Sequence, residues 1–286
     1  MKNKKIITIL VLLITVCSIV ATMSGIFSID GVGKHTIESF RGNRVEIYGK
    51  GLYGDMSADV AVQGIAQDWV TLLVGVPLLL IGLFLSRRNS LRGIFLLSGT
   101  LSYFFLTYLF YTAMAMYNRM FLVYVLLLGA SFFAFILNIF SYDINKLKDD
   151  FKSEKILKYA GIFLMINSTM IGFLWLSIVV PPLFDGTIVP VAVEHYTTLI
   201  VQGFDLGLFL PMTFVSGFLA FKKNIHGYLF TVISILFLSL LMIALTSKVL
   251  FMANAGQNVI PVIFIIPTIC LTAIGFSVLL LKNVKS

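Results

Sequence analysis

Gln67 and Asp68 stand at the start of a long apolar stretch, where their side chains could bind a ligand. Gln67 lies four residues after Gln63 and four before Thr71, so on a helix these three side chains share one face, with Asp68 beside them. Ionisable residues in membrane spans are costly and usually face a bundle interior or a wet cavity. We therefore expect Asp68 near the outer end of a spanning helix, facing either the bundle interior or a wet cavity.

A second polar cluster repeats this arrangement later in the chain. His195, Gln202 and Asp205 are separated by seven and three residues, so on a helix they would share one face. Glu194 stands directly before His195 in the sequence. Asp205 and Lys222 stand at opposite ends of the same apolar stretch. At about 1.5 Å per residue, this spacing places the Asp205 carboxylate close to the outer edge of a hydrocarbon core.

Together these residues predict an outward-facing polar vestibule that binds a small solute or ion. Carboxylate oxygens and imidazole suit a cation, while Arg119 and Lys248 could pair with the acids or receive an anionic group. The alternative is that hydration, snorkelling and helix capping satisfy the acids without a ligand. The candidate ligand-binding residues are Gln67, Asp68, Arg119, Glu194, His195, Gln202 and Asp205.

The sequence offers little for metal binding, catalysis or nucleotide binding. Its three histidines stand far apart, and the two cysteines, Cys17 and Cys270, lie in separate apolar stretches. Gly-rich phosphate-binding loops do not occur in it. We therefore assign no metal site and no catalytic residue, and the cofactor stays unknown.

The composition is that of an integral membrane protein. Of 286 residues, 59% are hydrophobic and 12% are charged, whereas soluble domains average roughly 45–50% and ~25%. A helix needs about 20 apolar residues to cross a hydrocarbon core. Eight stretches are long enough: Ile6–Phe27, Ile65–Leu85, Gly93–Met116, Met120–Phe140, Tyr159–Val180, Leu199–Phe221, Gly227–Phe251 and Val259–Leu281. The predicted fold is an all-α membrane protein with about eight transmembrane helices.

Basic residues gather at alternate ends of these stretches. With the N-terminus in the cytoplasm, 15 of the 21 Lys and Arg residues fall on the cytoplasmic side, so the positive-inside rule places both termini there. The net charge of +8 then reflects topology and anionic headgroups rather than a nucleic-acid partner. The N-terminal segment has the basic start of a signal peptide but a poor cleavage site, so we expect an uncleaved first helix.

Residues 28–64 form the one sizeable loop. Thr36–Phe40 and Val45–Tyr48 flank a polar turn, which predicts a small β-hairpin over the outer mouth. Both a lid and a simple loop cap are consistent with this pattern.

Two parts of the sequence share a layout. Gln63–Gly93 and Gln202–Gly227 both begin with Gln-Gly, carry an aspartate near the start and end in a cationic loop. In both, a proline precedes the final glycine at the same spacing, Pro77 before Gly93 and Pro211 before Gly227. A duplication predicts two four-helix repeats, residues 1–143, which include the outer loop, and residues 144–286. With four spans each, the repeats enter the membrane in the same direction.

Three motifs between Val45 and Phe140 carry a resemblance: GKGLYGDMSADVAVQGIAQDWVTLLVGVPLLL, SLRG and YNRMFLVYVLLLG. In these motifs the chain resembles a group of prokaryotic polytopic membrane proteins without an assigned activity. The resemblance implies a prokaryotic plasma (inner) membrane and assigns no site residue.

Binding or translocation of a small solute or ion is therefore the leading hypothesis for function. An intramembrane enzyme and a non-catalytic scaffold or sensory subunit are the alternatives. Flux in proteoliposomes, turnover in detergent without a gradient, and co-purification of a partner distinguish the three. The lipid bilayer is the expected environment, and the sequence leaves the oligomeric state open.

Overall fold

The computed structural model describes residues 3–147 and 149–285, and in this part of the chain eight helices are long and apolar enough to cross a membrane. Lys2 and Lys148, two of the predicted cytoplasmic lysines, lie outside the described residues. The eight spans are α1 (Lys4–Phe27), α2 with α3 (Ala58–Arg87), α4 (Leu91–Met114), α5 (Phe121–Ile139), α6 with α7 (Glu154–Phe184), α8 with α9 (Ile200–Phe221), α10 (Ile225–Asn254) and α11 (Val262–Asn283). The predicted fold class, an all-α membrane protein, is confirmed.

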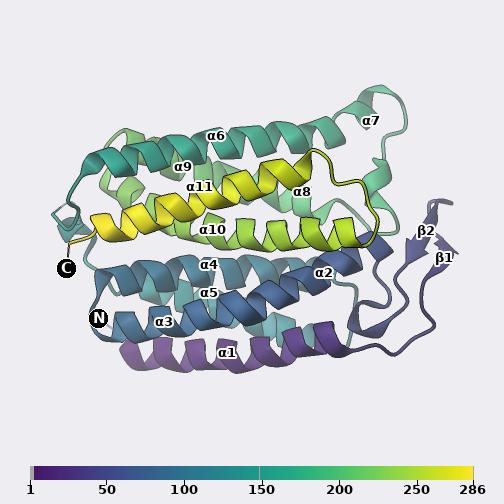
Figure 1. Cartoon of the computed structure of the whole chain (residues 1–286), viewed down its shortest axis with the longest axis horizontal. Coiled ribbons are helices and arrows are strands. Elements are labelled where there is room, and N and C mark those ends of the chain that lie inside the picture. Colours follow the sequence, from purple (N-terminus) through teal and green to yellow (C-terminus); the bar gives the residue numbers. More distant parts are fainter. Residues whose placement is uncertain (1–2, 148, 286) are drawn as a thin grey trace.

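The spans form two groups that lie side by side, α1–α5 in one and α6–α11 in the other (Figure 1). Helices α4 and α10 pack against each other where the groups meet, and α10 also packs along α2 (Ala58–Val70). A Cβ atom on Gly99 of α4 would lie 2.5 Å from the Cβ of Leu236 on α10, so the glycine permits the close approach of these two helices. Both ends of the chain lie at the same end of the molecule (Figure 1).

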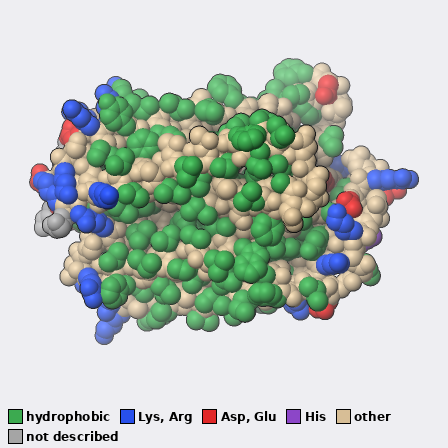
Figure 2. Space-filling model, viewed as in Figure 1, with side chains coloured by type: hydrophobic (Ala, Val, Ile, Leu, Met, Phe, Trp, Pro, Cys, Tyr) green, Lys and Arg blue, Asp and Glu red, His purple; other side chains and the backbone are tan. Residues whose placement is uncertain are grey.

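Apolar side chains cover the middle of the face seen in Figure 2, and the charged side chains on this face gather at its two ends. The exposed face of α1 shows the pattern well, because its exposed large residues recur every three or four positions: Ile9, Leu12, Val16, Val20, Met23 and Phe27. Such a surface suits hydrocarbon and not water, as expected for spanning helices.

The predicted β-hairpin is present, with each strand starting one residue earlier than expected. Strands β1 (His35–Glu38) and β2 (Arg44–Ile47) pair in antiparallel fashion at the end of the molecule opposite the termini (Figure 1). Arg41, between the strands, donates hydrogen bonds to the carbonyl oxygens of Tyr196 (2.8 Å) and Thr197 (3.0 Å). The hairpin therefore joins the two groups of helices at this end.

The turns that follow the second and sixth spans match position by position. The preceding helices end at Arg87 and Phe221. In both turns, an asparagine or lysine with positive φ, Asn89 (61°) or Lys223 (58°), precedes the residue that caps the next helix, Ser90 or Asn224. Three residues after each cap comes a glycine, Gly93 or Gly227. A Cβ atom there would lie 2.4 Å from the backbone nitrogen of Ser86 or 2.2 Å from that of Ala220.

Both of these spans are interrupted by a π-helical turn at the same place. η2 (Thr71–Gly75) separates α2 from α3 (Val76–Arg87), and η5 (Asp205–Phe209) separates α8 (Ile200–Phe204) from α9 (Leu210–Phe221). A proline stands at the second residue of α3 and of α9, and because proline has no N–H, it removes one backbone hydrogen bond of the span just after each π-helical turn. The two interruptions therefore lie at matching positions of their spans, and each is followed by a proline at the same spacing.

Candidate functional site

Asp68 lies in the interior of the first group of helices, and its side chain is only 1% exposed. The Tyr53 hydroxyl donates a 2.6 Å hydrogen bond to one carboxylate oxygen, and the Tyr111 hydroxyl lies 3.0 Å from the other. Gly25 of α1 leaves room for this carboxylate, because a Cβ atom on Gly25 would lie 1.9 Å from it. The carboxylate is thus held by two phenols in a space that a glycine provides.

A cluster of tyrosine rings surrounds this carboxylate. Tyr111 meets Tyr53 and Tyr124 edge to face at centroid distances of 6.1 and 5.3 Å, and Tyr108 stacks on Tyr124 at 6.0 Å. Burial, together with the Asp68 charge, raises the pKa of Tyr53 well above its usual range. The Tyr53 hydroxyl therefore keeps its proton and remains a donor to Asp68.

Gln67 belongs to a second buried network on the neighbouring face of α2. Its amide nitrogen donates to the hydroxyls of Tyr103 (2.8 Å) and Thr107 (3.1 Å), and the Thr71 and Tyr103 hydroxyls lie 2.9 Å apart. Among the described residues, the amide oxygen of Gln67 is buried and has no hydrogen-bond partner. Gln67 and Asp68 thus fasten α2 to α4, at the point where the π-helical turn η2 begins.

Asp205 begins the matching turn η5 in the other group of helices. The indole nitrogen of Trp175 on α6 donates a 2.8 Å hydrogen bond to its carboxylate, and the side chain is partly buried. In the register set by the two prolines, Asp205 corresponds to Thr71, and Gln202 corresponds to Asp68. The two aspartates therefore occupy positions one helical turn apart rather than equivalent ones.

Lys248 of α10 links the two acids electrostatically. Its ammonium lies within Coulomb range of both Asp205 and Asp68. The close ion pairs of the described residues, Lys34–Glu46 and Lys223–Glu154, do not include it. One lysine thus interacts electrostatically with two carboxylates without a close ion pair to either, and these three residues carry a formal charge of −1.

A cavity of about 250 Å³ opens between the two groups of helices at the hairpin end. Gln63 of α2, Trp175 of α6 and Gln202 of α8 supply polar atoms to its lining, and Tyr196 adds an aromatic wall. The remaining lining residues are Val60, Met114, Ala192, Thr198, Leu199, Ile200 and Val201. Because Trp175 also holds Asp205, this cavity lies beside the η5 carboxylate.

The helical face expected from His195 to Asp205 is wrong at its beginning, because α8 starts only at Ile200. His195 instead lies in a loop, with its Nε2 2.9 Å from the carbonyl oxygen of Asp55. The next residue, Tyr196, is buried and accepts a hydrogen bond from the Ser57 amide (3.2 Å). His195 and Tyr196, which lie outside helices and strands, are therefore held by contacts with residues just before the second span.

Glu194 takes part in the same loop and has a strained backbone, with φ of 50°. One of its carboxylate oxygens and the Nδ1 atom of His195 are buried without a hydrogen-bond partner in the described part of the chain. Both residues belong to the loop beside the cavity and lie outside its lining.

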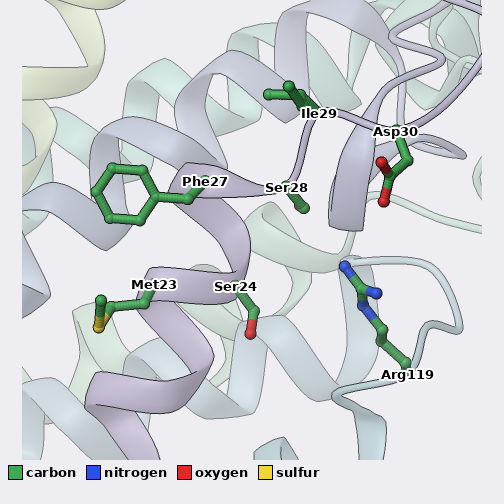
Figure 3. Close-up of a pocket in the computed structure, with 7 residues that line it drawn as sticks. All are labelled: Met23, Ser24, Phe27, Ser28, Ile29, Asp30 and Arg119. Atoms are coloured by element: carbon green, nitrogen blue, oxygen red, sulfur yellow. The ribbon is translucent and has the colours of Figure 1, made fainter.

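Arg119 lies elsewhere, on the exposed loop between α4 and α5, where it lines a different cavity with Asp30 (Figure 3). The structure therefore distributes the predicted site residues over four places. Gln67 and Asp68 are in a helical interior, Gln202 and Asp205 lie beside the cavity between the groups, Glu194 and His195 lie in the loop next to it, and Arg119 is on the side of α1.

Sequence reasoning missed Tyr53, Tyr111 and Trp175, which hold the two carboxylates. Their only signal is a hydroxyl or indole group near an apolar stretch, and many such groups occur in this chain. Lys248, by contrast, can be recognised from the sequence alone, because a single lysine in an apolar stretch needs a partner or a polar surrounding.

The eight long apolar helices of the described residues define a multi-pass integral membrane protein. Comparison with protein-family models, curated proteins and solved structures found no match for the chain. Function must therefore be argued from the geometry of the chain itself.

Proposed function

We propose that the protein binds a small cation between its two groups of helices and moves it across the membrane. The paired interruptions η2 and η5 carry this proposal, because broken spans at corresponding positions of two halves are typical of transporter binding sites. Asp68 lies just before η2, Asp205 begins η5, and Lys248 lies within Coulomb range of both. π-Helical turns also occur frequently at functional sites.

The charges favour a cation over an anion. Two carboxylates and one ammonium leave one negative charge, and carboxylate and phenol oxygens are ligands that cations accept. The cavity lined by Gln63, Gln202 and Trp175 supplies an entrance beside Asp205. In this proposal a cation enters there, exchanges water for these oxygens and repels the Lys248 ammonium from its place near the carboxylates.

We further propose that residues 1–143 and 144–286 are parallel tandem repeats. The turns, prolines and glycines that match at one constant sequence offset support this division. The packing also repeats, because α3 contacts α4 and α4 contacts α5, as α9 contacts α10 and α10 contacts α11. Alternating access would then be a rocking of one repeat against the other at the α4–α10 contact.

The termini are proposed to face the cytoplasm of a prokaryotic cell, with the protein in its plasma membrane. Lysines and arginines lie at both ends of the molecule (Figure 2), and by their places in the sequence 15 of the 21 belong to the side that holds both termini, which agrees with the positive-inside rule. The cavity and the β-hairpin then face outward.

Reconstitution in liposomes loaded with dyes for H⁺, Na⁺ or K⁺ tests the proposal. We expect uptake of at least one of these cations by the wild-type protein and its loss in Lys248→Gln, because in this proposal the Lys248 ammonium must return toward the carboxylates to release the cation. Lys282→Gln, in the last turn of α11, is the matched control and should retain uptake. Turnover of a substrate in detergent would favour an enzyme instead, and neither uptake nor turnover would favour a scaffold.

A further inference from the structure

A second cavity, of about 430 Å³, lies at the hairpin end on the side of α1, away from the contact between the two groups of helices. Its two charged lining residues point toward one another, Asp30 from the segment after α1 and Arg119 from the loop between α4 and α5 (Figure 3). The close ion pairs of the described chain are elsewhere, so these two charges do not neutralise each other directly.

Both charged residues stand on fixed backbone. The Ser28 hydroxyl accepts a 2.7 Å hydrogen bond from the Leu52 amide, and the carbonyl oxygen of Asp30 accepts one of 2.6 Å from the Gly51 amide. On the other side, the Asn118 side chain accepts from the Met120 amide (2.9 Å). A fixed frame lowers the entropy that a ligand must overcome to order its site.

The apolar part of this cavity continues into the lipid-facing surface. Met23 and Phe27 line it together with Ser24 and Ile29. Met23 and Phe27 are also the last two members of the exposed apolar stripe of α1. A ligand with a charged head at Arg119 and Asp30 would therefore lay a hydrocarbon chain along α1.

We propose that this cavity binds the headgroup of a membrane phospholipid that carries a primary amine. Arg119 would hold the phosphate, because a guanidinium matches two phosphate oxygens at once. Asp30 would accept hydrogen bonds from the ammonium, and Met23 and Phe27 would contact the beginning of an acyl chain. The inference concerns a surface separate from the proposed cation site and does not depend on transport.

Native mass spectrometry of the purified chain tests this proposal by counting bound lipids. The probes are phosphatidylethanolamine, phosphatidylcholine and phosphatidylglycerol with identical acyl chains, and free phosphoethanolamine. We expect phosphatidylethanolamine to bind about tenfold more tightly than the other two lipids, because a trimethylated or absent amine cannot donate hydrogen bonds to Asp30. Free phosphoethanolamine should bind far more weakly, since it lacks the chain that contacts α1.

Three variants separate the two contacts. Asp30→Asn should lower phosphatidylethanolamine binding to the level of phosphatidylcholine, whereas Arg119→Gln should weaken all three lipids. Arg44→Gln removes an exposed arginine of β2 that lines neither cavity, and it should change nothing. Equal binding of the three lipids by the wild-type chain overturns the proposal without any variant. Equal effects of Arg119→Gln and Arg44→Gln, or tight binding of free phosphoethanolamine, overturn it as well.

Discussion

The Asp68 carboxylate fits into the interior of the first group of helices because residue 25 is a glycine, which has no side chain there. The carboxylate occupies the position that a side-chain methyl group would take and receives the Tyr53 hydroxyl there. A buried charge is tolerated only where it is paired or hydrogen-bonded, and here phenols supply these bonds. The glycine and the two tyrosines therefore act as one unit with Asp68.

Replacing Gly25 by alanine should consequently destabilise the protein. The new Cβ atom would lie 1.9 Å from the carboxylate, and forcing extra atoms into a packed interior costs typically about 1–3 kcal/mol. Thermal unfolding in detergent measures this loss. Gly129→Ala on α5 is the matched control, because a Cβ atom there meets nothing within 4 Å. Equal melting temperatures of the two variants would contradict the proposed role of Gly25.

At this scale the sequence predicts that Asp68 and Asp205 lie in spanning helices but not what holds their side chains. Asp68 and Asp205 stand out because charges are rare in apolar stretches. Tyr53 and Tyr111 do not stand out, since their hydroxyls reach Asp68 only after three separate segments pack together. The spacing of His195 predicts a helix, whereas its contact with Asp55 holds it in a loop.

The interrupted spans are the elements that distinguish this fold from a simple bundle. Each π-helical turn carries one residue more than an α-helical turn, which changes the direction of the side chains that follow. Asp68 and Thr71 flank the start of η2, and Asp205 begins η5. The interruptions thus lie where the polar side chains are, as a binding site between helices requires.

The sequence predicts the eight spans and the hairpin because hydrophobic length and turn residues specify them locally. It does not predict the π-helical turns, since no residue type specifies an inserted helical residue. Pro77 and Pro211 indicate only that a discontinuity is close.

If the matched turns are equivalent elements, their glycines should respond alike to substitution. Gly93→Ala and Gly227→Ala would each place a Cβ atom against the backbone of the preceding helix. Each should therefore lower stability by about 1–3 kcal/mol, as measured by thermal unfolding. Gly275→Ala on α11 meets nothing within 4 Å and serves as the control. Sensitivity at only one of the two positions would contradict the equivalence.

Over the whole molecule, charge and length predict how the chain is arranged in the membrane. The residues between the first two spans form the hairpin at one end, and both termini lie at the other (Figure 1). The contact between α4 and α10 is a property of the whole fold that the sequence does not reveal, because neither helix has a distinctive pattern. The close approach at Gly99 was likewise unpredicted.

Cysteine labelling in intact cells tests the proposed orientation. Single cysteines at Asn43, in the hairpin, and at Asn89, between α3 and α4, are introduced after Cys17 and Cys270 have been changed to alanine. A membrane-impermeant maleimide should label position 43 and leave position 89 unlabelled until the cells are opened, since these sites lie on opposite sides of an eight-helix fold. Labelling of both sites in intact cells would contradict this orientation.

The central claim, one cation site that includes Asp68 and Asp205, is tested most directly by a double-mutant cycle. Asp68→Asn, Asp205→Asn and the double variant are compared with the wild-type protein for cation uptake in liposomes and for melting temperature. Asn keeps the shape of Asp and removes only its charge, so we expect each single change to abolish uptake, with little loss of stability and no further loss in the double variant. If both acids only stabilise helix ends, each change should cost about 0.5–2 kcal/mol, and the losses should add. Additive losses of stability with uptake retained would contradict the claim.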